Sequence, residues 1–176
     1  MLKNPSRLAI SLCLLAAFCA LAGCASYGGS SLQAGASGQA ETRALMGEPA
    51  AVHPAPSGAA YAESWEYPRG PLGRHTFMAR FDRTGKLVSI DQVLTGEMVG
   101  RIRMGLDTRD DVRRLLGRAA MVFPVRSGGE TWDYAAYPGK SDMRKIRLSV
   151  TFDNRGIATA AGESYDPESF TTAPHR

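Results

Sequence analysis

The chain has 176 residues, with 21 Lys and Arg against 17 Asp and Glu and a net charge of +4. Without the first 23 residues, which include Lys3 and Arg7, the balance is 19 basic to 17 acidic side chains, a charge of +2. A charge this close to neutral argues against a nucleic-acid-binding protein, because such proteins draw their affinity from many contacts between cationic side chains and phosphates. The remaining 176 minus 23, or 153, residues are enough for one domain or two small ones.

The N-terminal segment has the pattern of an export signal. Lys3 and Arg7 form a short positive start, and residues 8–22 then carry no charge. This apolar stretch matches the core of a signal peptide and is shorter than the ~20 apolar residues of a membrane-spanning helix. The pattern therefore predicts a signal peptide over residues 1–23.

The signal is followed directly by Leu21-Ala22-Gly23-Cys24, which resembles the lipobox of bacterial lipoproteins. The resemblance implies that Cys24 becomes the mature N-terminus, carries palmitate or similar acyl chains and anchors the protein in a membrane. Ala25 in the next position implies transport to the outer membrane, with the protein on its periplasmic face. The alternative is that Cys24 is a small buried residue near an ordinary cleavage site.

Cysteine usage limits the covalent chemistry of the mature chain. Cys13 and Cys19 lie inside the predicted signal, so Cys24 alone would remain and no intramolecular disulfide could form. The Gly- and Ser-rich residues 24–31 predict a flexible tether between the lipid and the folded part.

A five-residue phrase occurs twice and indicates an internal repeat. "ESWEY" at 63–67 returns as "ETWDY" at 130–134, and the two phrases contain both tryptophans of the chain. Glycines 35 and 105, arginines 43 and 113, and glycines 47 and 117 lie 70 apart, while Phe-Asp pairs at 81–82 and 152–153 lie 71 apart. This period is too long for a solenoid and predicts two tandem units, residues 32–95 and 96–165, followed by a mobile tail at 166–176.

In the first unit, the predicted helix begins at Ser37 as its cap and ends at Gly47, with Pro49 just beyond. Alternation of apolar and polar residues predicts strands in the Trp65 phrase, at residues 75–81 and at 86–94, the last two joined by the turn "DRTG".

In the second unit, a short helix is predicted at 96–103 and a longer one after Asp107 or Thr108, where "TRDD" has the form of a capping box. Gly117 ends it, and strands follow in the Trp132 phrase, at residues 145–152 and at 157–163. The predicted class is therefore α+β, with two short helices packed on a three-stranded antiparallel sheet in each unit.

The repeated Trp and Tyr are predicted to be core residues. A small sheet under two helices has little apolar volume, and one Trp buries up to ~250 Å². The alternative is an aromatic platform that binds sugar rings or a peptide. The core interpretation is favoured because the same pair recurs beside the same alternation in both units.

The second unit resembles the BamE (SmpA/OmlA) domain of outer-membrane lipoproteins over most of residues 98–162. The motif positions are Gly105, Leu116, Gly117, Trp132, Tyr134, Phe152 and Gly156. The first unit, residues 32–93, resembles it more distantly. The best-known member of that family is an accessory of the machine that folds β-barrel proteins into the outer membrane, so the resemblance implies a protein-binding role.

No enzymatic chemistry emerges from the remaining residues. His53, His75 and His175 are scattered without metal-ligand spacing and are predicted to lie at the surface. Ser37 lacks the Gly-x-Ser-x-Gly context of a nucleophile. We therefore expect no catalytic residue, no metal, no cofactor and no small-molecule substrate.

Three arginines of the second helix, Arg109, Arg113 and Arg114, form a possible partner-binding patch. The alternative is a solvated helix face with weak ion pairs. Together these features predict a lipid-anchored, non-catalytic accessory or scaffold of envelope assembly. An inhibitor of a periplasmic enzyme, similar to the secreted β-lactamase inhibitor proteins with duplicated units, is the alternative function.

Overall fold

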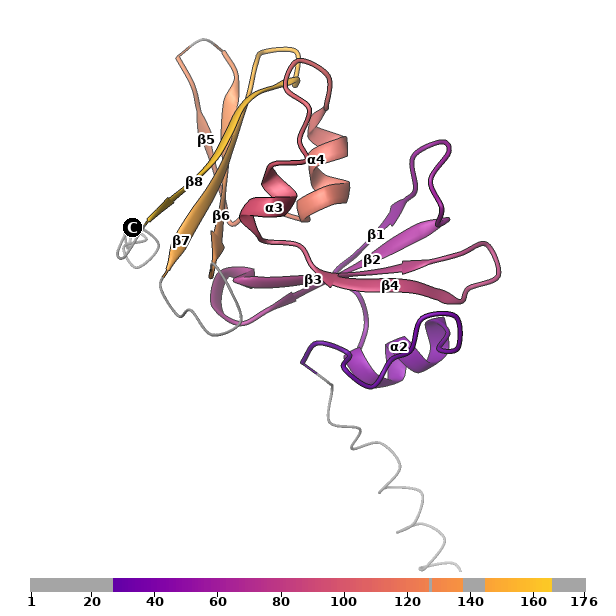
Figure 1. Cartoon of the computed structure of the whole chain (residues 1–176). Coiled ribbons are helices and arrows are strands. Elements are labelled where there is room, and N and C mark those ends of the chain that lie inside the picture. The colour runs from indigo at the N-terminus through magenta and orange to yellow at the C-terminus, as the bar shows by residue number, and fades with distance from the viewer. Residues whose placement is uncertain (1–26, 127, 138–144, 166–176) are drawn as a thin grey trace, which may run out of the picture.

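The computed structural model describes residues 27–126, 128–137 and 145–165. The N-terminal half forms one antiparallel sheet of four strands in the order β1-β2-β3-β4, with helix α2 against one face (Figure 1). Its elements are α2 (Gln39–Met46), β1 (Ala51–Pro54), β2 (Glu63–Arg69), the 3-10 turn η1 (Pro71–Gly73), β3 (His75–Phe81) and β4 (Leu87–Gln92).

The C-terminal half repeats this plan with a second four-stranded antiparallel sheet, ordered β5-β6-β7-β8. Its elements are α3 (Gly96–Val99), α4 (Arg109–Leu116), β5 (Met121–Pro124), β6 (Glu130–Ala136), β7 (Ile146–Phe152) and β8 (Ala158–Tyr165). Helices α3 and α4 lie between the two sheets (Figure 1). The α+β class is thus confirmed.

The expected strand number is wrong, because each sheet has four strands. The additional strands are β1 and β5, which pair with the Trp-containing strands β2 and β6. Each is four residues long and ends in a proline, Pro54 or Pro124. Such segments are too short to show a period of two, and Pro restricts a strand to the sheet edge.

The helices also differ from expectation. The first short helix of the second half covers Gly96–Val99, half of the predicted 96–103. The described part of the first half contains one α-helix, α2, and no counterpart of α3. Gly29 has a φ of +66° where its counterpart Val99 is helical. Glycine favours this conformation and disfavours a helix.

Capping was predicted correctly for α4 and incorrectly for α2. The Thr108 hydroxyl accepts the Asp111 N–H, and the Asp111 carboxylate accepts the Thr108 N–H, which completes the capping box. The N-cap of α2 is Gly38, which makes no side-chain cap. Ser37 lies one residue earlier, and its hydroxyl accepts the backbone N–H of Gln33 at 3.1 Å.

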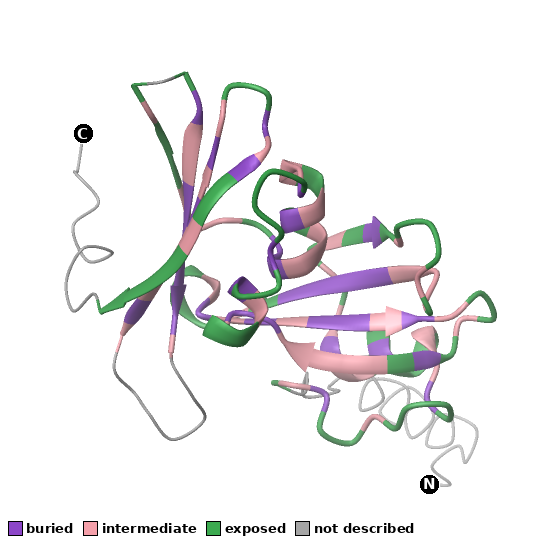
Figure 2. Ribbon diagram, turned by 45° about the horizontal axis from the view of Figure 1, so that its top comes forward, coloured by how far each residue is buried: buried purple, intermediate pink, exposed green. Residues whose placement is uncertain are grey.

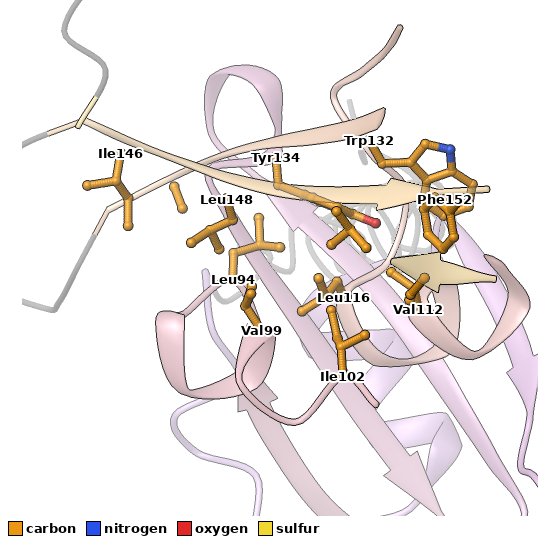
Figure 3. Close-up of a cluster of buried hydrophobic side chains, with 13 residues drawn as sticks. Leu94, Val99, Ile102, Val112, Leu116, Trp132, Tyr134, Ile146, Leu148 and Phe152 are labelled. Atoms are coloured by element: carbon orange, nitrogen blue, oxygen red, sulfur yellow. The ribbon is translucent and has the colours of Figure 1, made fainter. Parts of the chain in front are cut away.

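The tryptophans lie in the cores, as predicted. Trp65 and Trp132 are each 3% exposed, and each ring packs against a phenylalanine with centroids 4.7 and 4.8 Å apart. Buried side chains fill the space between the second sheet and helices α3 and α4 (Figure 3). Both faces of the first sheet carry buried residues, as the continuous burial along β2 shows (Figure 2).

The back face of the first sheet, remote from α2, meets the C-terminal end of α4. Glu66 on β2 is 3% exposed, and its carboxylate accepts the backbone N–H of Arg118 at 2.9 Å and pairs with His53 at 2.9 Å. Met78 on the same face is fully buried. A buried carboxylate is tolerated when hydrogen bonds satisfy it, so this joint fixes the two halves against each other.

The same hydrogen bonds occur in both halves, between residues that lie 67, 70 or 71 positions apart in the chain. The bond from Leu32 N–H to Gly29 O recurs 70 residues later as Ile102 N–H to Val99 O, at 2.9 and 3.1 Å. The indole N–H of each tryptophan donates to the glutamate two residues before it, at 2.8 and 2.9 Å. Further pairs follow the same pattern: Gly35 to Leu87 with Gly105 to Ala158, and Gly47 to Arg43 with Gly117 to Arg113.

Candidate interaction surface

The arginines of α4 divide between two environments. Arg113 places its guanidinium 5.0 Å from the centre of the Trp132 ring, in a cation–π contact. Arg109 lies over the Phe152 ring and donates to Glu130 at 2.5 Å. These two arginines therefore cover the aromatic core of the second half.

Arg114 points elsewhere, into a cleft between the two halves. The cleft has a volume of about 200 Å³. The first half contributes Pro56, Tyr61 and Arg80, and the second half contributes Arg101, Arg103, Asp107, Asp111, Arg114 and Leu115. Of the three predicted patch residues, Arg114 alone lines this cleft. The partner-binding role of all three stays a prediction.

Ion pairs hold the cleft arginines in place. Arg114 donates to Asp111 at 2.6 Å, and Arg103 donates to Asp107 at 2.6 and 2.8 Å through two nitrogens. Burial tends to raise the pKa of Asp111, but hydrogen bonds from Thr108 and Arg114 outweigh it and hold that pKa below its usual value. The hydrogen bond and charge of Asp107 raise the pKa of Arg103.

A scan against protein-family models matched residues 92–162 to the outer membrane protein assembly factor BamE domain. The second half is BamE-like. A search of curated proteins found no match, and a search of solved structures found none either.

The BamE-like domain includes α3 to β7 and most of β8, and therefore both helices beside the cleft. Its predicted motif residues are structural: Gly105, Gly117 and Gly156 adopt positive φ angles of 78°, 82° and 83°. Leu116, Trp132, Tyr134 and Phe152 are 0–3% exposed. Burial raises the pKa of Tyr134, whose hydroxyl donates to the Gly117 carbonyl at 3.3 Å.

The first-half wall of the cleft was not predicted from the sequence. The Arg80 guanidinium lies 5.6 Å from the centre of the Tyr61 ring and pairs with Asp91. The sequence does not predict that these residues lie near Arg114, because contacts between the halves produce no periodic pattern of residues along the chain. The surface position predicted for His53 is wrong, since this residue is 9% exposed and its ring pairs with the Glu66 carboxylate.

The described residues give no support for a metal site or for a membrane-spanning helix. They contain no group of three or more His, Cys, Asp or Glu side chains placed to hold a metal. The helices there are all too short or too polar to cross a membrane. The predicted signal at 1–23, Cys24, the start of the predicted tether and the tail at 166–176 lie outside the described residues.

Proposed function

We propose that this protein is a non-catalytic, lipid-anchored accessory of outer-membrane protein assembly that binds other envelope proteins. The match of residues 92–162 to the BamE assembly-factor domain carries this proposal. The lipobox-like Leu21-Ala22-Gly23-Cys24 supports a lipid on Cys24 and a position at the periplasmic face of the outer membrane.

We further propose that the first half is a second, divergent BamE-like unit. Its sheet has the same strand order as the BamE-like domain, and backbone hydrogen bonds around α2 recur around α4 between residues 70 or 71 positions later. Arg43 lies 4.5 Å from the centre of the Trp65 ring, as Arg113 does at 5.0 Å from Trp132. Shared side-chain contacts of this kind are expected of a duplicated unit, because both copies keep the same core tryptophan and the arginine that covers it.

The cleft between the halves is the proposed docking surface. Arg101 and Arg114 have side chains 58% and 26% exposed, within reach of a partner. Arginine binds carboxylates through parallel hydrogen bonds and stacks on planar groups, so an acidic segment of another envelope protein fits this lining best. The cleft exists only when both halves are present, which gives the pair of units a role that neither has alone.

The test is a crosslinking pull-down of the tagged full-length protein from intact cells. We expect outer-membrane assembly proteins to be recovered, and the double variant Arg101→Gln and Arg114→Gln to reduce their recovery. The control is Arg155→Gln, which removes an arginine of similar pairing on the β7–β8 turn, 78% exposed and away from the cleft. Equal recovery with both variants would dismiss the cleft as the docking surface.

The inhibitor alternative predicts a different result. The purified protein would abolish the activity of a periplasmic hydrolase at one-to-one stoichiometry and would not copurify with membrane-protein assemblies. That outcome would replace the proposed function.

A further inference from the structure

The turn η1, which joins β2 to β3, carries a leucine in a strained conformation. Leu72 has a φ of 59° and a ψ of 19°, and it is the only residue other than glycine with a positive φ in the described part of the chain. A bulky side chain disfavours this left-handed region, which glycine and asparagine adopt more easily. Packing does not offset the strain, because Leu72 is 45% exposed. A strained and exposed apolar residue of this kind is a candidate for a function outside the fold.

A second exposed apolar side chain, Tyr27, lies against the same turn. Its hydroxyl hydrogen-bonds to the His75 ring at 2.7 Å, and the Arg69 guanidinium donates to its backbone carbonyl at 3.2 Å. A Cβ on Gly70, two residues before Leu72, would lie 3.5 Å from the Tyr27 hydroxyl. Tyr27 is nevertheless 55% exposed. The turn and Tyr27 therefore form one surface, fixed to the first sheet, from which two apolar side chains project.

The charge of the β2–β3 hairpin suits the surface of an anionic bilayer. Residues 67–81 contain three arginines and no acidic side chain. Anionic phospholipid headgroups attract arginines and repel carboxylates. Tyrosine is enriched at the same interface, because its ring is apolar and its hydroxyl is polar. The hairpin thus has the composition of a segment that lies at the boundary between headgroups and acyl chains.

The length of chain between Tyr27 and the predicted lipid identifies the membrane as the partner of this surface. Tyr27 follows Cys24 by three residues. A chain advances at most ~3.6 Å per residue, so the two Cα atoms lie within about 11 Å of each other whatever the conformation of the residues between them. Tyr27 falls within the tether predicted for residues 24–31, but it is hydrogen-bonded to the sheet. A lipid on Cys24 would therefore hold Tyr27 and the adjacent Leu72 at the membrane surface.

We propose that Leu72 inserts into the membrane surface, with Tyr27 beside it at the level of the headgroups. The inference rests on the proposed lipid on Cys24 and adds a second point of contact, which restricts the tilt that a single anchor leaves open. The turn is also coupled to the second half, because η1 lies beside β6 (Figure 1) and the Arg74 guanidinium lies 5.5 Å from the centre of the Tyr137 ring. Contact of the turn with the bilayer therefore orients both halves and the cleft between them.

The test compares two exposed leucines of the same protein. The full-length protein is purified from cells with its lipid and reconstituted in vesicles of phosphatidylethanolamine and phosphatidylglycerol that contain a phospholipid with a diazirine in one acyl chain. After illumination, trypsin releases residues 70–74, with Leu72, and residues 104–109, with Leu106, and mass spectrometry measures the lipid adducts on each peptide. Leu106 is 66% exposed and would react more than Leu72 if exposure alone decided the yield. We expect the opposite, with adducts on the Leu72 peptide and few on the Leu106 peptide.

Two substitutions separate membrane contact from folding. Leu72→Asn removes the apolar side chain and introduces a residue that tolerates the left-handed conformation. The adduct yield on its peptide should fall roughly three- to tenfold, the factor expected for the exposed part of one leucine side chain, which is 45% exposed. The melting temperature of this variant should not fall. Leu72→Met keeps an apolar side chain of similar volume and should keep the yield.

Four other outcomes overturn the proposal and are distinguishable. Adduct yields that follow exposure in a lipidated protein refute the contact and leave the anchor intact. An N-terminal peptide without lipid refutes the anchor and the contact together. A lower melting temperature for Leu72→Asn shows that Leu72 stabilises the fold by packing. In cells fed photoleucine, crosslinks from the Leu72 peptide to another protein and not to phospholipid show that the turn docks a protein.

Discussion

Variants of two matched glycines can show how much the joint between the halves contributes to the free energy of unfolding. Gly47 and Gly117 both follow a helix and both have a φ of +82° with an extended ψ, a conformation essentially restricted to glycine. Alanine at either position should cost about 1–3 kcal/mol of the free energy of unfolding for that reason. A Cβ at Gly47 meets nothing within 4 Å, whereas one at Gly117 would lie 2.7 Å from the Glu66 carboxylate and 3.2 Å from Thr76.

Crowding at the joint should therefore make Gly117→Ala worse than Gly47→Ala by about 1–3 kcal/mol, the usual cost of overpacking a well-packed site. Urea unfolding of both variants, followed by tryptophan fluorescence and circular dichroism, gives the two free energies. In a Glu66→Ala background the excess should shrink, because the added methyl group then has room. Equal losses for the two glycine variants would refute the packing of α4 against the first sheet.

Three further predictions concern the BamE-like domain. Trp132→Ala should lower the free energy of unfolding by about 3–5 kcal/mol in thermal or urea melts, because a ring only 3% exposed is removed; an unchanged melt with lost binding would instead make it a binding platform. Thr108→Ala removes the cap of α4 and should cost about 1 kcal/mol, and a loss below a few tenths would show that the capping box adds little. Asp111 has a pKa lowered in the folded state, so its contribution is present above the unfolded value of about 3.9 and lost as pH falls through the folded value. Asp111→Asn should therefore flatten the decline of the melting temperature below about pH 4, and an unaltered acid limb would contradict this.

Patterns of neighbouring residues in the sequence predicted the helices and strands that have strong periodicity, but they did not predict the shortest strands. The alternation at Ile146–Phe152 and the capping box at Thr108 each specify a structure within a few residues, and both were found. Strands β1 and β5 have only four residues each and depend on pairing with a neighbour for their conformation. Ser37 fitted the composition of a cap, but backbone geometry gave that position to Gly38.

The candidate site was harder to predict than the fold, because it lies between distant segments. The pattern at α4 identified its arginines but not their directions, since Arg109 and Arg113 bind aromatic rings that follow later in the chain. The opposite wall, with Tyr61 and Arg80, becomes part of the cleft only through packing of the two halves. Packing of this kind depends on shape and leaves no short motif.

The Glu66 joint also bears on the order in which the chain becomes stable. Glu66 receives the N–H of Arg118, a residue 52 positions later, so a chain that emerges from its N-terminus completes the first sheet before that partner is available. Until then the carboxylate and the Met78 side chain face water on an uncovered sheet. A fragment that ends at residue 95 should consequently expose this face and be less soluble than the whole chain. The second half protects the face once it has folded against it.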